Sequence, residues 1–217
     1  MNSDADLQKD VLAELEFEPS VNVEDIGVSV KEGIVTLNGS VDSYPEKLAA
    51  ACAAKRVAGV KGLAEDIVVK LPDSSRRTDS HIVAAAVDAV KWTSTVPADT
   101  VKITVHDGWL SLEGAVEGWH QKNAAQEAVC NLAGVKGVTN LIEIKPKVAS
   151  MDIKGAIKAA FERHALLDAQ KVQVEINGNN VVLRGHVRSF IEREEAERAA
   201  WAAPGVTHVE NRIVLII

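Results

Sequence analysis

The sequence predicts an α+β protein of three tandem α-β-β-α-β units, each with two helices packed on one face of a three-stranded sheet. Two observations predict this fold. A nine-residue segment at 33–41 returns 75 positions later at 108–116, and a further 71 positions on at 179–187. The residue patterns around each copy also return in the same order, and such self-similarity indicates one structural unit used several times. The units are expected at residues 1–72, 79–146 and 150–217.

Each unit is expected to open with an amphipathic helix. Its apolar residues recur at positions i, i+4 and i+8, a spacing that places one apolar stripe toward a core. The three stripes are Leu7, Val11 and Leu15; Ile82, Ala86 and Val90; and Ile153, Ile157 and Phe161.

A β-hairpin is expected after this helix. Two short runs alternate apolar and polar residues, as half-buried strands do. The residues between the runs, Glu32-Gly33, Asp107-Gly108 and Asn177-Gly178, tolerate the positive φ of a tight turn. In the third unit Asn179 stands where the other two have the hairpin glycine, and asparagine can also hold a left-handed turn. The outer face of the sheet is expected to be the more polar one, as at Thr36 and Ser111.

The second helix of each unit is rich in alanine, which would let it lie close to the sheet. Ser43 with Glu46, and Ser189 with Glu192, fit the capping box that starts a helix. A Gly-Val pair follows each helix, at 59–60, 134–135 and 205–206, where glycine supplies the left-handed residue that closes a helix. A last alternating strand completes the unit.

Charge is distributed unevenly along the chain. The net charge of −7 lies entirely in residues 1–75, which hold 7 Lys+Arg against 14 Asp+Glu, whereas 76–149 and 150–217 are each balanced. This acidity opposes tight binding of nucleic acid or anionic lipid through the first unit, and no nucleic-acid partner is expected. Cys52 and Cys130 are expected to be two buried structural thiols rather than a disulfide or metal pair.

The start of the chain, residues 1–6, is acidic and polar, without the basic segment and apolar core of a secretory signal. A cytoplasmic location, peripheral to the membrane at most, is therefore expected. The expectation becomes periplasmic if a leader has been removed.

The hairpin pattern G-x-V-x-L-x-G-x-V, the alanine-rich helix and the Gly-Val pair together resemble the BON domain, in three copies. The first copy shows the pattern at Gly33, Val35, Leu37, Gly39 and Val41. The family takes its name from osmotically induced OsmY-type proteins and nodulation-related proteins. The resemblance implies a non-enzymatic module that binds phospholipid or membrane surfaces, often in osmotic or envelope stress.

An aromatic residue recurs at the start of the second helix, as Tyr44, Trp119 and Phe190. Such a ring, beside free helix N–H groups, could insert among lipid headgroups or could simply pack over the sheet edge. Trp109 at the hairpin and Trp92 at the end of the first helix add two further candidates. Both lie in the middle unit with Trp119, so that unit is the expected contact with lipid or partner. Its candidate headgroup partners are Lys122, Lys102 and Lys91.

Other motifs favour ordinary structural roles. Gly59-Val60-Lys61-Gly62 imitates the G-x-x-G loop of KH domains but would join a helix to a strand, so a helix cap explains it better. The six histidines form no H-x-H or H-x₃-H pair, so neither a metal site nor a cofactor is expected. The run of alternating charge at 192–198 is typical of a solvated helix face, and no nucleophile–base pattern or phosphate-binding loop predicts an enzyme. Two alternatives to lipid binding stay open: a stress-related scaffold or chaperone-like protein that binds proteins at its sheet edges, and a small-ion-binding module. The oligomeric state stays open as well.

Overall fold

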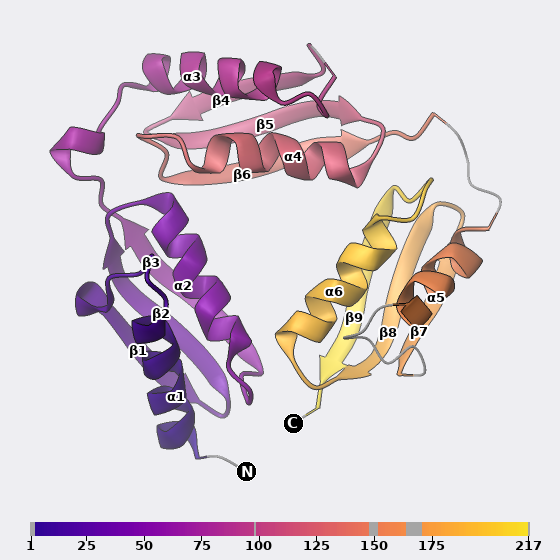
Figure 1. The fold of residues 1–217 in the computed structure, drawn as a ribbon, viewed down its shortest axis with the longest axis horizontal. Helices are drawn as coiled ribbons and strands as arrows, with labels where there is room; N and C mark the ends of the chain where they lie inside the picture. Colours follow the sequence, from indigo (N-terminus) through magenta and orange to yellow (C-terminus); the bar gives the residue numbers. More distant parts are fainter. Residues whose placement is uncertain (1–2, 98, 148–151, 164–170, 217) are drawn as a thin grey trace. The chain divides into compact units, whose positions relative to one another are not determined.

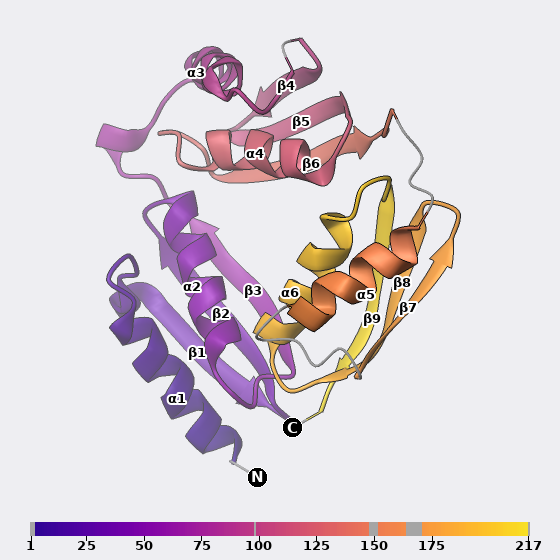
Figure 2. The ribbon, with the colours of Figure 1, turned by 45° about the vertical axis from the view of Figure 1, so that its right-hand side comes forward.

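The chain folds into three repeats of the expected kind in a computed structural model that describes residues 3–97, 99–147, 152–163 and 171–216. Each described repeat contains two helices and one three-stranded sheet, which confirms the α+β class and the α-β-β-α-β order. Figures 1 and 2 show both helices of each repeat on the same face of its sheet.

The elements of the first repeat are α1 (Asp4–Phe17), η1 (Val23–Asp25), β1 (Ile26–Lys31), β2 (Ile34–Val41), α2 (Tyr44–Arg56) and β3 (Gly62–Val69). A short helix η2 (Asp73–Ser75) precedes the second repeat, which comprises α3 (Asp79–Trp92), β4 (Val101–His106), β5 (Trp109–Val116), α4 (Trp119–Cys130) and β6 (Gly137–Ile144). The third comprises α5 (Ile153–Arg163), β7 (Val172–Asn177), β8 (Asn180–Val187), α6 (Phe190–Trp201) and β9 (His208–Leu215).

The middle strand of each sheet is the second strand of the hairpin. β2 pairs antiparallel with β1 and parallel with β3, and β5 does the same with β4 and β6. The third sheet has the order β7-β8-β9. The helix between the second and third strands is thus the crossover that a parallel connection requires.

The core of each repeat lies between its helices and its sheet. All nine residues of the predicted first-helix stripes are buried, and so are Val35 and Leu37 of β2 with their counterparts in β5 and β8. The alanine-rich helices bury Ala50 and Ala53 in α2, Ala125 in α4 and Ala196 in α6. These alanines therefore belong to the core of their repeats.

One cysteine prediction is wrong. Cys52 is exposed on α2 and Cys130 is half-buried on α4, and both thiols are free. On an alanine-rich helix the sequence gives little contrast between faces, because alanine occupies both. Four alanines of α2, at 50, 51, 53 and 54, face inward and leave Cys52 outside.

The hairpin turns confirm the need for positive φ in the first two repeats. Glu32 and Gly33 have φ of 55° and 80°, and Asp107 and Gly108 have φ of 51° and 81°. In the third repeat the loop is Gly178-Asn179, and the positive φ of 61° belongs to Gly178, whereas Asn179 is not among the described residues with positive φ. The expectation that Asn179 holds the left-handed turn is therefore wrong, because glycine one position earlier adopts it instead.

The second glycine of the hairpin motif is required because a carbonyl oxygen just before the first strand lies too close for a side chain. Gly39 has φ of 111°, and a Cβ there would collide with the carbonyl oxygen of Asp25. Gly114 and Gly185 have the same backbone sign and face the carbonyl oxygens of Thr100 and Lys171. Both conditions, positive φ and no room for Cβ, select glycine.

A carboxylate at the first residue of the first helix holds each of the first two hairpins. Asp4 accepts hydrogen bonds from the backbone N–H groups of Glu32 (2.8 Å) and Gly33 (3.0 Å). Asp79 accepts the equivalent bonds from Asp107 (2.9 Å) and Gly108 (3.0 Å). The start of the helix is thereby fixed at the hairpin end of the repeat.

Candidate functional site

The recurring aromatic position at the start of the second helix differs in exposure between repeats. Tyr44 is the first residue of α2 and is only 8% exposed. Trp119 and Phe190 occupy the same position in α4 and α6, and both are half-buried. Tyr44 is thus buried in the protein, whereas Trp119 and Phe190 keep part of their surface exposed to solvent.

The most exposed aromatic side chain is Trp92, the last residue of α3, which is 88% exposed. The buried stripe of α3 runs through Ile82, Ala86 and Val90, so Trp92 follows the last buried residue by about 200° around the helix and faces away from the core. Phe17 is the last residue of α1 at the aligned position and is 80% exposed. The third repeat has Arg163 there. The structure therefore places Trp92, a predicted contact candidate, on the surface.

Trp109 lies at the opposite end of the second repeat from Trp92. It is the first residue of β5, directly after the hairpin turn to which the start of α3 is hydrogen-bonded. Its ring covers Gly137 of the neighbouring strand, where a Cβ would collide with the ring, and it is 54% exposed. With 14 residues at about 1.5 Å each, α3 carries the chain roughly 20 Å from this end to Trp92.

Trp92 and Trp119 share the end of the second repeat away from the hairpin. Trp119 comes three residues after β5 ends at Val116, and β5 runs away from the hairpin. Lys91 precedes Trp92, and Lys122 lies one turn into α4. We call Lys91, Trp92, Trp119 and Lys122 the tryptophan end. The candidates of the middle repeat therefore divide into this group and Trp109 at the hairpin. Lys102 lies early in β4, paired with Glu113 and away from the hairpin.

Lys122 is the less accessible of the two lysines. Its side chain is half-buried, and burial lowers the pKa of its ammonium group below the usual value. Its backbone oxygen accepts a hydrogen bond from the Asn140 amide at 2.9 Å, which ties the first turns of α4 to β6. Lys91 is exposed at the end of α3, so Lys91 is the lysine better placed to meet an anionic group.

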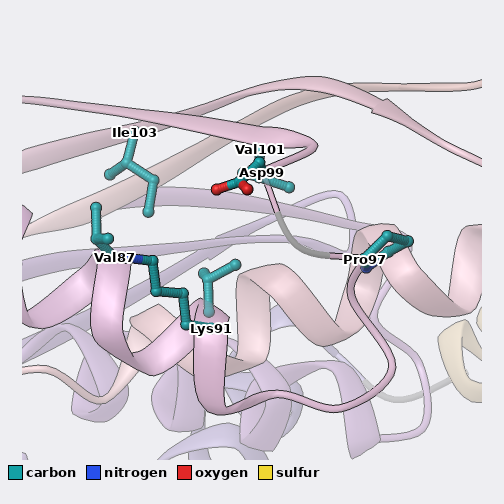
Figure 3. A pocket seen from close by; sticks show the side chains of 7 residues that line it. Val87, Lys91, Pro97, Asp99, Val101 and Ile103 are labelled. Atoms are coloured by element: carbon teal, nitrogen blue, oxygen red, sulfur yellow. The ribbon is translucent and has the colours of Figure 1, made fainter.

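A small cavity of about 60 Å³ opens beside the tryptophan end, between α3 and β4. Figure 3 shows its lining side chains, with Val87 and Lys91 on the helix and Val101 and Ile103 on the strand. Val90, Pro97 and Asp99 complete the lining. Asp99 has the left-handed φ of 61°, which is uncommon for a residue other than glycine.

The cavity follows from side-chain size on α3. Val87 takes the place that Leu12 has in α1, and Val83 takes that of Gln8, whose amide donates to the Val28 oxygen of β1 at 2.7 Å. Shorter side chains cover β4 less completely, and Val101, Ile103 and Val105 are all half-buried. Aliphatic side chains and Pro97 line most of the cavity, and Lys91 and Asp99 bring one cation and one anion to it. The cavity could not be predicted from residue types alone, since it depends on how α3 lies over β4 in the folded repeat.

None of the helices in the described parts of the chain is long and apolar enough to cross a membrane.

Comparison with known proteins identifies the repeat. The model of the BON domain family matches residues 3–70, 78–146 and 151–216. The osmotically-inducible protein Y of Escherichia coli K12 is 27% identical over 152 residues, which cover 65% of this chain and 73% of that protein.

Two solved structures align with this chain over most of their length. CdsD, a structural protein of the type III secretion system of Chlamydia trachomatis, is 13% identical, with 97% of this chain and 92% of that chain covered and a TM-score of 0.27. The PrgH periplasmic domain is 10% identical, with 89% and 96% covered and a TM-score of 0.22. At such scores the likeness supports no conclusion about this chain.

Proposed function

Because this chain belongs to the BON domain family, we propose that it is a non-enzymatic binding protein of the osmotic stress response that docks on anionic phospholipid through its tryptophan end. The similarity to the osmotically-inducible protein Y supports the physiological setting. The observation that carries the docking surface is Trp92, an indole 88% exposed beside an exposed lysine.

The energetics favour a tryptophan at a lipid interface. An indole presents an apolar body and a polar N–H, and it settles at the headgroup level where one end is apolar and the other wet. Transferring roughly 200 Å² of ring surface at about 25 cal/mol/Å² gains about 5 kcal/mol before the cost of immobilisation. A lysine near an anionic surface adds about 1 kcal/mol, and Lys91 is the neighbour that supplies it.

Charge selects the second repeat over the first. Phe17 is nearly as exposed as Trp92 and has the same place on its helix. However, the chain segment around Phe17 carries the whole net charge of −7, whereas 76–149 is balanced. Repulsion between like charges opposes docking of the first repeat on an anionic surface. Trp92 and Phe17 are therefore suited to a matched comparison, because they share position and exposure and differ in the charge of the surrounding repeat.

Sedimentation with vesicles of phosphatidylglycerol and phosphatidylcholine at low salt tests the proposal. The full chain is expected to co-sediment, and Trp92→Ala is expected to lose at least roughly tenfold in affinity, equivalent to 1.4 kcal/mol. Lys91→Glu should weaken binding and flatten its dependence on phosphatidylglycerol content. Phe17→Ala is the matched control and should bind within about twofold of the parent chain. Equal binding by Trp92→Ala and the parent chain would remove the tryptophan end from consideration.

A second candidate function is capture of an extended protein segment at a sheet edge. The third strand of each repeat is an outer strand. Each of these strands exposes one large aliphatic side chain: Val68 on β3, Leu141 on β6 and Val214 on β9. A free edge flanked by apolar side chains can accept a partner strand. Binding of an unfolded reporter protein that Leu141→Lys weakens, with vesicle binding unchanged, would favour this function over lipid docking.

A further inference from the structure

The hairpin tip of the second repeat gathers three side chains of the types that ligate metal ions in proteins. The ligand atoms of Asp79, His106 and Asp107 all lie within 4.8 Å of one another. The Nε2 atom of His106 is 3.7 Å from Oδ2 of Asp107. Two of the three come from the hairpin and the third from the start of α3, so the cluster joins two elements of the fold.

The residues of this cluster are particular to the second repeat, although the first repeat has the same hairpin and the same helix start. In the first repeat Asp4 makes the same pair of bonds to the hairpin, but the positions of His106 and Asp107 hold Lys31 and Glu32. In the third repeat they hold Asn177 and Gly178. The hairpin therefore does not require the imidazole, since the first repeat forms the same hairpin with a lysine at that position.

We propose that Asp79, His106 and Asp107 bind a divalent first-row transition-metal ion, with Zn²⁺ the best match. One imidazole nitrogen and two carboxylate oxygens are donors that Zn²⁺ accepts at about 2.0–2.2 Å, with water completing the coordination. Donors around such an ion lie closer together than 4.8 Å, so the cluster must contract slightly. The side chains of His106 and Asp107 are 93% and 83% exposed and are free to rotate inward.

Asp79 is the fixed member of the set. Its two carboxylate oxygens accept the N–H groups of Asp107 and Gly108, and these bonds hold its orientation. Each carboxylate oxygen has a second lone pair that remains available to a cation. Hydrogen bonding of a ligand carboxylate is the usual way in which its orientation toward a metal is set.

Binding would cross-link the start of α3 to the tip of the β4–β5 hairpin. An ion that binds the folded repeat and not the unfolded chain stabilises it in proportion to the logarithm of its concentration over Kd. The second repeat should therefore melt at a higher temperature in Zn²⁺, while the first repeat should not. This inference does not depend on lipid docking, because the hairpin lies at the opposite end of the repeat from Trp92.

Calorimetric titration of the full chain with Zn²⁺, together with thermal melts, tests the inference. One equivalent is expected to bind with a rise in the melting temperature of the second repeat. His106→Lys installs the residue of the first repeat and should cut affinity at least tenfold without harming the fold. His120→Lys changes another exposed histidine of the same repeat and should leave binding unchanged.

Building the same cluster into the first repeat is a more stringent test. Lys31→His places an imidazole beside Asp4 and Glu32, and this variant should bind a second equivalent of Zn²⁺. Mg²⁺ should bind at least tenfold more weakly than Zn²⁺ in the parent chain, because an imidazole is a poor ligand for it. The inference is overturned if the parent chain binds no Zn²⁺, or if His106→Lys titrates like the parent chain.

Discussion

Removing the carboxylate that holds the second hairpin should destabilise the second repeat by about 2 kcal/mol. In Asp79→Ala the N–H groups of Asp107 and Gly108 lose their acceptor. Asp79 is half-buried and water can reach the bond to Asp107, so water replaces part of what is lost, and we take about 1 kcal/mol per bond as the net loss. The acidic side chain at the helix start adds up to about 0.5 kcal/mol through the helix dipole. Asp79→Asn keeps one acceptor oxygen and should lose about half as much.

Urea unfolding followed by tryptophan fluorescence measures this loss in the right repeat. The second repeat holds Trp92, Trp109 and Trp119, the third holds Trp201, and residues 1–75 hold none. With a slope of about 1–2 kcal/mol/M for a domain of this size, the midpoint of the second repeat should fall by roughly 1–2 M. Asp88→Ala, an exposed aspartate later on the same helix, serves as the control and should not lower the midpoint. An unchanged midpoint for Asp79→Ala would show that the hairpin needs no such clamp.

Four further predictions follow from the packing and the charges. Val87→Leu adds a methylene to the cavity between α3 and β4 and should raise the free energy of unfolding of the second repeat by about 0.8 kcal/mol in a urea titration, whereas a loss would show that the slot cannot admit it. Gly114→Ala should destabilise the same repeat by more than 1 kcal/mol, measured the same way, because the new Cβ would meet the Thr100 oxygen at a positive φ; a fully stable variant would contradict this. Arg56 donates hydrogen bonds to Glu14 at 2.7 Å and to Glu18 at 2.9 Å, and the latter holds the pKa of Glu18 below its usual value. A lowered carboxyl pKa stabilises the folded state at neutral pH, and this contribution is lost as the pH falls through the lowered pKa. Arg56→Gln should therefore be less stable than the parent chain at pH 7, measured by circular dichroism, and equal to it at acid pH. Cys52 should react with a thiol reagent faster than Cys130, because Cys52 is exposed whereas burial raises the pKa of the Cys130 thiol; equal rates in a timed absorbance assay would contradict this.

The sequence was sufficient for the fold because each element left a local signature. Apolar spacing found the buried stripes of α1, α3 and α5, and glycines with positive φ found the turns. The motif glycine Gly39 was found as a pattern, but its reason, the approach of the Asp25 carbonyl, needed the paired strands. Local rules identify such positions because the same short-range sterics act in every repeat.

The residue types of the candidate site could be predicted from the sequence, but their places in the folded repeat could not. The aromatic residues of the second repeat were found from the sequence, but Trp109 and Trp92 turned out to lie at opposite ends of it. Residue types do not report exposure on an alanine-rich helix, which is why Cys52 was misplaced. The His106 cluster escaped for a different reason: its third member, Asp79, is 27 positions away in the chain and meets it only through the folded hairpin.

The central place of β2, β5 and β8 has a consequence for synthesis on the ribosome. A repeat cannot close its sheet until its last strand has emerged, because the parallel partner of the middle strand is the final element to be made. A nascent chain halted after Arg56 would present one side of β2 with unpaired backbone groups. Pauses in translation are therefore tolerable between repeats and hazardous within them, where a half-made sheet offers its edge to neighbouring chains.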